Sequence, residues 1–110
     1  MEKFFFKKEN IEYEELGLGV KRKILAHDKN LMIVEVHFDK GSEGAIHTHK
    51  HEQITYVLEG KFLFTVGEKI EEVKKGDSIY MPKNISHGAK CVEKGVLLDI
   101  FTPQREDFLN

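Results

Sequence analysis

Residues 32–38 read Met-Ile-Val-Glu-Val-His-Phe, and every second side chain in this stretch, from Met32 to Phe38, is apolar. Successive side chains of a β-strand point to opposite faces, so the pattern predicts a strand with one firmly apolar face. Similar short runs lie on both sides of it along the chain. These further strand candidates are residues 20–26, 54–58, 62–66, 78–81, 89–92 and 96–101.

Residues 59–61, which contain Gly60, predict a bend before the candidate strand 62–66, and the glycine-containing segments at 75–77 and 93–95 supply turn chemistry between the candidates. Only residues 103–110, which begin with Pro103, favour a short helical turn. Many short strands with almost no helix predict an all-β sandwich or small barrel. A chain of 110 residues has the usual length of one domain, and we expect residues 1–110 to form one.

The composition excludes several classes of protein. The formal net charge is −2, whereas a dedicated nucleic-acid binder usually carries a strongly basic surface. No run approaches the roughly 20 apolar residues of a membrane span, and nothing resembles a signal peptide. Cys91 is the single cysteine, so no disulfide can form within the chain. We therefore expect a cytoplasmic protein that binds neither nucleic acid nor membrane.

Three of the six histidines fall within residues 47–51, which read His-Thr-His-Lys-His. Residues two apart on a strand share a face, so His47 and His49 can direct their imidazoles toward one point. Gln53 follows shortly after, and His87 arrives from a later strand. These four residues form a candidate metal site. His51 and Glu52 are rival ligands, and the alternative is a set of surface histidines on a polar strand.

The spacing of these residues resembles the two sequence motifs of the cupins, over nearly the whole chain. The first motif consists of Gly41, His47, His49, Gln53 and Gly60, and the second of Gly76, Pro82 and His87. The resemblance implies a one-domain cupin, with the double-stranded β-helix (jelly-roll barrel) fold. It also implies one divalent metal ion bound by His47, His49, Gln53 and His87.

Three positions depart from the cupin pattern. Gln53 replaces the usual glutamate ligand, Asn84 replaces a glycine and Cys91 replaces an asparagine. Three imidazoles and an amide are all neutral, so a bound ion would keep its full double charge and attract an anionic oxygen strongly. Such donors suit Zn, Ni, Fe, Mn or Cu, and the donor set alone does not choose among these metals.

Asp99 is the only polar residue in the apolar run 95–101. Both faces of that strand are apolar, so its carboxylate has no evident route to solvent, and burying it requires a partner. One interpretation is a structural ion pair with Arg105. The other places Asp99 inside the barrel as a general acid and base, with Arg105 binding a substrate carboxylate and Phe101 forming an apolar wall.

Residues 51–60 and 98–108 together resemble the pectin-degradation cupins. Members of that family convert 4,5-unsaturated uronates, the products of polysaccharide lyases, into a linear 5-keto-4-deoxyuronate. The resemblance assigns the functional roles of that family to Asp99, Phe101 and Arg105, beside the four metal ligands. It implies an enzyme that acts on a small anionic sugar.

Two other functions are compatible with the same residues. One is a different metal-dependent cupin enzyme, such as a dioxygenase or isomerase, and the other is a cupin that binds a sugar without turnover. Arg22 is expected on the surface, with a second anion contact as the alternative, and Tyr56 is a candidate for reaching the cavity. The aromatic N-terminal segment 1–16 either caps the barrel or mediates a homodimer.

Overall fold

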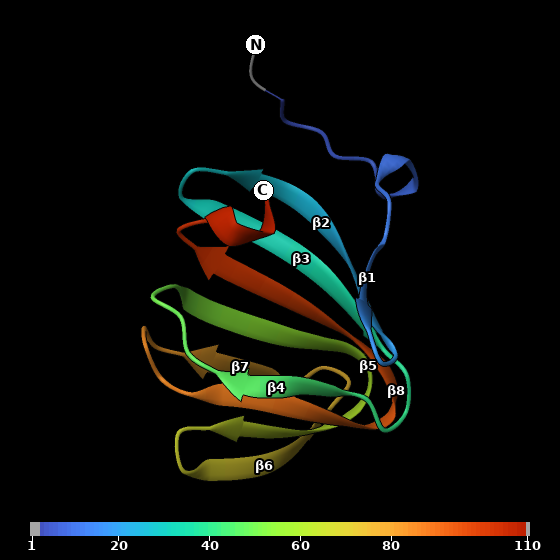
Figure 1. The fold of residues 1–110 in the computed structure, drawn as a ribbon, viewed down its shortest axis with the longest axis vertical. Helices are drawn as coiled ribbons and strands as arrows, with labels where there is room; N and C mark the ends of the chain where they lie inside the picture. The colour runs from blue at the N-terminus through green and yellow to red at the C-terminus, as the bar shows by residue number, and fades with distance from the viewer. Residues whose placement is uncertain (1–2, 110) are drawn as a thin grey trace.

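The structure is a computed structural model that describes residues 3–109, and their strands form one antiparallel sheet rolled into a barrel (Figure 1). The eight strands are β1 (Glu14–Gly17), β2 (Val20–Asp28), β3 (Leu31–Phe38), β4 (Glu43–His47), β5 (Glu52–Val66), β6 (Lys69–Lys74), β7 (Ser78–Met81) and β8 (His87–Thr102). Two short 3₁₀ turns, Lys8–Asn10 and Glu106–Phe108, complete the described elements. The all-β prediction is confirmed, including the helical turn near the C-terminus.

Two long strands, β5 and β8, run antiparallel along almost their full length and belong to both layers of the barrel. The first half of β5 pairs with β7 and with the second half of β8, which also pairs with β3. The second half of β5 pairs with β6 and with the first half of β8, which also pairs with β4. The β4–β5 and β7–β8 loops lie at the same open side of the barrel (Figure 1).

Both long strands bend where the two layers meet, and glycine permits the bend. Gly60 has a φ of +86°, and a Cβ added there would lie 2.5 Å from the carbonyl oxygen of Lys94. A Cβ on Gly95 would meet the carbonyl oxygen of Glu59. The bend predicted at 59–61 is confirmed, whereas the turn predicted at 93–95 is wrong. Both segments are bends inside continuous strands, and each pair of predicted short strands is one long strand.

The bend also changes which side chains of β5 face the interior. Gln53, Thr55 and Val57 are buried before it, whereas Phe62 and Phe64 are buried after it. The register shift between Val57 and Phe62 produces this change of parity. The result is that β5 buries side chains on the interior side of both layers, although their parity differs before and after the bend.

The apolar core fills the interior between the two layers. Fully buried Met32, Val34, Phe62 and Met81 lie in it, and each contributes about 1.5–3 kcal/mol of burial free energy. Cys91 is buried in the same cluster and forms no disulfide. Strands β1, β4 and β6 were not predicted, because they lack a sustained apolar alternation and are mostly exposed. No helical turn within residues 3–109 is long and apolar enough to cross a membrane.

Candidate metal and substrate site

The three candidate histidine ligands come from the open side of the barrel. His47 is the last residue of β4 and pairs with His87, the first residue of β8. His49 lies in the loop after β4, so the prediction that it shares a strand with His47 is wrong. The loop nevertheless returns its ring to the other two. The centroid of the His87 ring lies 4.6 Å from that of His47 and 4.7 Å from that of His49.

One ligand nitrogen from each of these histidines lies within 4.8 Å of the other two. Each Nδ1 is held by a main-chain carbonyl: that of His47 by Ala45 at 2.8 Å, that of His49 by His51 at 3.0 Å and that of His87 by Ile85 at 3.0 Å. A carbonyl only accepts hydrogen bonds, so each Nδ1 carries the proton and each Nε2 presents a lone pair. The cluster can therefore hold a metal ion.

Gln53 places its amide oxygen against this cluster. The Oε1 atom lies 2.9 Å from Nε2 of His49, and the amide nitrogen donates to Oγ1 of Thr55 at 2.9 Å. The lone pair on Nε2 of His49 and a lone pair on Oε1 of Gln53 therefore face each other at hydrogen-bonding distance. Nε2 of His87 is in addition buried without a partner. Both features are explained by a cation bound among these atoms, and the residues present fit a divalent metal.

Asp99 extends this polar network along β8. It pairs with Thr55 of β5 and with Val34 of β3, and its Oδ1 accepts a hydrogen bond from Oγ1 of Thr55 at 2.7 Å. Its side chain lines a cavity of about 170 Å³ together with His47 and His87. The carboxylate thus faces the same space as the histidine cluster.

Arg105 and Phe108 close one side of this cavity. Arg105 does not pair with Asp99, as one interpretation of the sequence held. It pairs instead with Asp107, at 3.0 Å through Nε and 2.8 Å through a terminal nitrogen. Its guanidinium lies 5.1 Å from the ring centroid of Phe101 and 4.2 Å from that of Phe108. Its other N–H groups take no part in this ion pair, and the guanidinium lies beside two aromatic rings of the cavity lining.

Arg22 also lines this cavity, contrary to the expectation of a surface position. Its guanidinium lies 3.8 Å from the centroid of Phe108, and its Nε donates to Glu14 at 2.8 Å. The signal for this was its parity with Val20 on the same strand, where Val20 is buried. The guanidinium groups of Arg22 and Arg105 therefore both lie close to the ring of Phe108 in the cavity lining.

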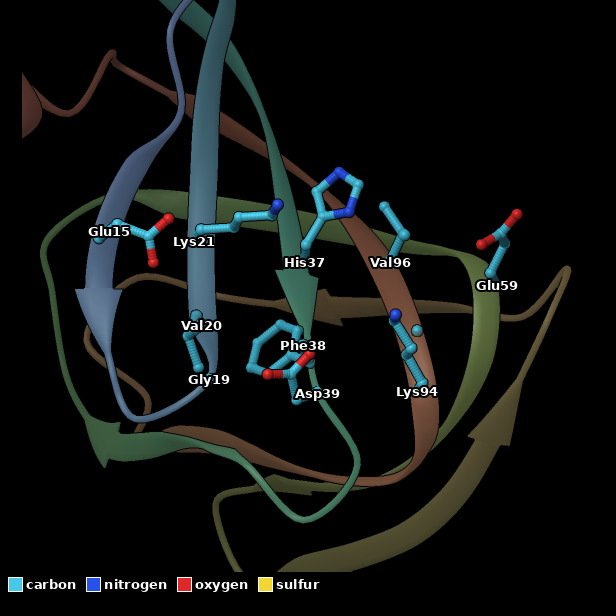
Figure 2. Close-up of a pocket in the computed structure, with 11 residues that line it drawn as sticks. Glu15, Gly19, Val20, Lys21, His37, Phe38, Asp39, Glu59, Lys94 and Val96 are labelled. Carbon is cyan, nitrogen blue, oxygen red and sulfur yellow. The ribbon is translucent and has the colours of Figure 1, made fainter.

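A larger cavity, of about 420 Å³, lies beside the bends of β5 and β8 (Figure 2). Its charged lining residues are Glu15, Lys21, Asp39, Glu59 and Lys94. The lining mixes both signs of charge, and none of the candidate site residues takes part in it. The smaller cavity beside the histidines is therefore the better candidate for a reactive site.

Comparison with known proteins agrees with this geometry. Residues 34–101 match the family model of the cupin domain. The chain belongs to the cupin family. It is 43% identical to the pectin degradation protein KdgF of Dickeya dadantii, over 96% of this chain and 97% of that protein.

Solved structures of cupins superpose closely on this one. An RmlC-like cupin from Shewanella frigidimarina has a TM-score of 0.93 and 43% identity, covering 97% of this chain and 96% of that one. KdgF from a Halomonas species has a TM-score of 0.92 and 34% identity, covering 97% of this chain and 99% of that one. The predicted cupin fold and the resemblance to pectin-degradation cupins are both confirmed.

The surroundings of two histidines of the cupin site, His87 and His49, favour their neutral forms. Burial lowers the pKa of His87 to about 4, and the positive charges of His47, His49 and Arg105 act in the same direction. Burial also lowers the pKa of His49. Neutral imidazole is the form that binds a metal, so the site is ready to bind one at neutral pH.

Burial has the opposite effect on the pKa of the Asp99 carboxyl group. It raises the pKa of Asp99 to about 6, against the hydrogen bonds from Thr55 and Gln53 and the charge of Arg105. A carboxyl group with a pKa near neutrality can both give and take a proton under physiological conditions. The cupin cavity therefore brings a carboxyl group with a raised pKa beside the histidine cluster.

The rival ligands do not join the histidine cluster. His51 is buried beside it, with its ring centroid 5.4 Å from that of His49, but it does not belong to the group within 4.8 Å. Glu52 accepts a hydrogen bond from the hydroxyl of Tyr80. Tyr56 is 40% exposed and does not line the cavity. Gln53, unlike His51 and Glu52, places a side-chain oxygen against a clustered histidine.

Proposed function

We propose that this cupin is a metal-dependent enzyme that converts 4,5-unsaturated uronate monosaccharides into linear 5-keto-4-deoxyuronates. The observation that carries the proposal is Asp99, a carboxyl group with a raised pKa that faces the histidine cluster across one small cavity. Similarity to KdgF over almost the whole chain supports the substrate class. The role that each residue has in this proposal follows from its position at this cavity.

His47, His49, Gln53 and His87 would hold one divalent transition metal ion, which can be Zn, Ni, Fe, Mn or Cu. When bound, such an ion supplies Lewis acidity that polarises a substrate oxygen. Because all four donors are neutral, the site retains a double positive charge for an anionic sugar. The carboxylate of a uronate meets that requirement.

Arg105 binds the substrate carboxylate in this proposal. A guanidinium group can donate two parallel hydrogen bonds to a carboxylate, and Arg105 already does so to Asp107 at the mouth of the cavity. Exchange of that partner for a substrate carboxylate keeps the same geometry. Phe101, whose ring forms part of the cavity wall, packs against the apolar face of the sugar.

Asp99 transfers the proton that opens the ring. Its carboxyl group protonates C4 of the C4=C5 double bond, and water adds to C5 with loss of a proton to the carboxylate, which gives a hemiketal. The C5–O bond of the ring then breaks as C5 becomes a ketone and the ring oxygen takes a proton. Loss of water at C1 gives the aldehyde, so the overall reaction is an isomerisation. A positioned acid and base of this kind contributes about 10²–10⁴-fold to the rate.

A homodimer in the cytoplasm completes the proposal. The outer face of the β3–β8–β5–β7 layer carries a cross-strand row formed by Ile33, Ile100, Ile54 and Tyr80. Ile54 and Tyr80 are 46% and 55% exposed. A second copy packed on this row would cover it, and Ile54→Lys should then give a monomer by light scattering.

Of the N-terminal aromatics, Phe4 and Phe5 are more than 70% exposed, so these two side chains do not cap the core.

The direct test follows the ultraviolet absorbance of an unsaturated uronate with purified protein. We expect the absorbance to fall, the fall to stop after treatment with a chelator, and one added equivalent of a divalent metal to restore it. Oxygen uptake by the iron-loaded protein without loss of uronate absorbance would indicate a dioxygenase. Tight sugar binding without turnover would indicate a binding protein.

A further inference from the structure

Thr55 occupies the centre of the polar network, although it belongs to neither cupin motif. It lies on β5, two residues after Gln53, and it pairs directly with Asp99 of β8. Its side chain is fully buried. A hydroxyl group buried in an otherwise apolar interior is unfavourable unless it is hydrogen bonded, so its contacts explain its presence.

The two contacts of this hydroxyl group fix its direction. The amide nitrogen of Gln53 can only donate, and it lies 2.9 Å from Oγ1 of Thr55. The hydroxyl proton must therefore point elsewhere, and the Oδ1 atom of Asp99 accepts it at 2.7 Å. One hydroxyl group thus accepts from the amide and donates to the carboxylate.

This arrangement selects one of the two orientations of the Gln53 amide. With the amide nitrogen held by Thr55, the Oε1 atom faces Nε2 of His49 at 2.9 Å. A flipped amide would direct N–H groups at the histidine cluster and repel a cation. It would also place the amide oxygen of Gln53, instead of its N–H donor, against the hydroxyl group of Thr55.

We propose that Thr55 is a positioning residue that holds the oxygen of Gln53 toward the metal and one oxygen of Asp99 in place for proton transfer. The second half rests on the proposed function, whereas the first half concerns metal binding alone. Outer partners of metal ligands typically alter metal affinity by about 10–100-fold when removed. We expect an effect of that size from the loss of the Thr55 hydroxyl group.

The test compares three variants of the full chain. Thr55→Val keeps the shape of the side chain and removes the hydroxyl group, whereas Thr55→Ser keeps the hydroxyl group and removes a methyl group. Thr65→Val is the matched control, because Thr65 lies on the same strand but lines a different groove, which contains none of the proposed site residues. Each chelator-treated protein is titrated with Zn²⁺ against a competing chromophoric chelator, and its melting temperature is recorded.

We expect Thr55→Val to bind Zn²⁺ about 10–100-fold more weakly than the parent protein, with Thr55→Ser and Thr65→Val within about threefold. A folded Thr55→Val protein with the affinity of the parent would overturn the proposal. Equal weakening in Thr55→Ser would also overturn it, because the hydroxyl group would not be the cause. If Thr55→Val does not fold, Thr55→Ala is measured in the same way and judged by the same outcomes.

Turnover separates this proposal from the proposed function. In uronate assays at saturating Zn²⁺, Thr55→Val should lose more than tenfold in kcat with little change in KM, and Thr55→Ser should recover most of it. An unchanged kcat would overturn the role toward Asp99. If the parent protein itself shows no turnover, the proposed function fails, and the Zn²⁺ titrations still decide the role of Thr55 toward Gln53.

Discussion

Replacing Asp99 with asparagine should make the protein less active and, at neutral pH, more stable. The asparagine side chain has nearly the same shape, and its oxygen can accept the hydrogen bond that Thr55 donates to Oδ1 of Asp99. The substitution removes the ionisable proton of the Asp99 carboxyl group. In the folded metal-free protein, burial raises the pKa of Asp99 from 3.8 to about 6.

The sign and size of the stability change follow from that pKa difference. The folded state holds the proton of Asp99 more tightly than the unfolded state, so the free energy of unfolding falls as the pH rises from about 4 to about 6. The full difference is worth up to about 3 kcal/mol, since one pKa unit corresponds to about 1.4 kcal/mol. Partial contact with solvent through the cavity makes this an upper bound. Asparagine has no such dependence on pH.

The measurement is urea unfolding of the chelator-treated parent and Asp99→Asn proteins at pH 4 and pH 7. The stability of Asp99→Asn relative to the parent should rise by about 2 kcal/mol between these two pH values. Comparing the two pH values removes any constant effect of the amide group. A relative stability that stays level, or that falls as the pH rises, would refute the reasoning about burial.

Activity of the same variant tests the catalytic role of the carboxyl group. The metal content of Asp99→Asn should equal that of the parent, because none of the four proposed ligands has changed. Its kcat on an unsaturated uronate should fall by at least about 100-fold, the lower range for a lost general acid and base. Retained turnover at normal metal content would show that Asp99 does not transfer the proton.

Three further changes have defined outcomes. Arg105→Lys should raise KM for the uronate about tenfold or more in steady-state assays, because lysine cannot donate two parallel hydrogen bonds; an unchanged KM would remove Arg105 from substrate binding. Gly60→Ala should lower the free energy of unfolding in urea by more than about 2 kcal/mol, since its Cβ would lie 2.5 Å from the Lys94 oxygen. Gly76→Ala, with positive φ but open space, should cost less, and equal losses would contradict the packing argument. The stability of His87→Gln relative to the metal-free parent should rise as the pH falls from 7 to 4, because burial lowers the pKa of His87 to about 4 in the folded state. Solvent screening makes about 3 kcal/mol the upper bound of this gain, and parallel pH profiles in urea unfolding would contradict it.

The strands of the barrel were predictable where one face is buried and the sequence alternates. Residues 32–38 are such a case, and β3 spans Leu31–Phe38. The alternation could not show that 54–58 and 62–66 belong to one strand, because Gly60 has the same sequence signature in a bend as in a turn. The carbonyl oxygen of Lys94, 2.5 Å from the position of a Cβ on Gly60, distinguishes the two and comes from a distant part of the chain.

The residues of the candidate site were also predictable only in part. The spacing of His47, His49 and His87 was sufficient to predict their cluster, since it is a property of the cupin motifs. The sequence offered Arg22 as a site residue only as the alternative to a surface position, and it did not indicate Thr55 at all. Their positions depend on which strand lies opposite, and single-sequence patterns carry no information about that pairing. Only the pairing of Thr55 with Asp99 shows what the hydroxyl group does.

A calorimetric titration of the chelator-treated protein with Zn²⁺ tests the metal centre most directly. We predict one equivalent bound per chain for the parent, with binding lost or reduced by orders of magnitude in His49→Ala and retained in His27→Ala, whose histidine lies outside the cluster. An absence of binding by the parent, or equal affinity in both variants, would contradict the account.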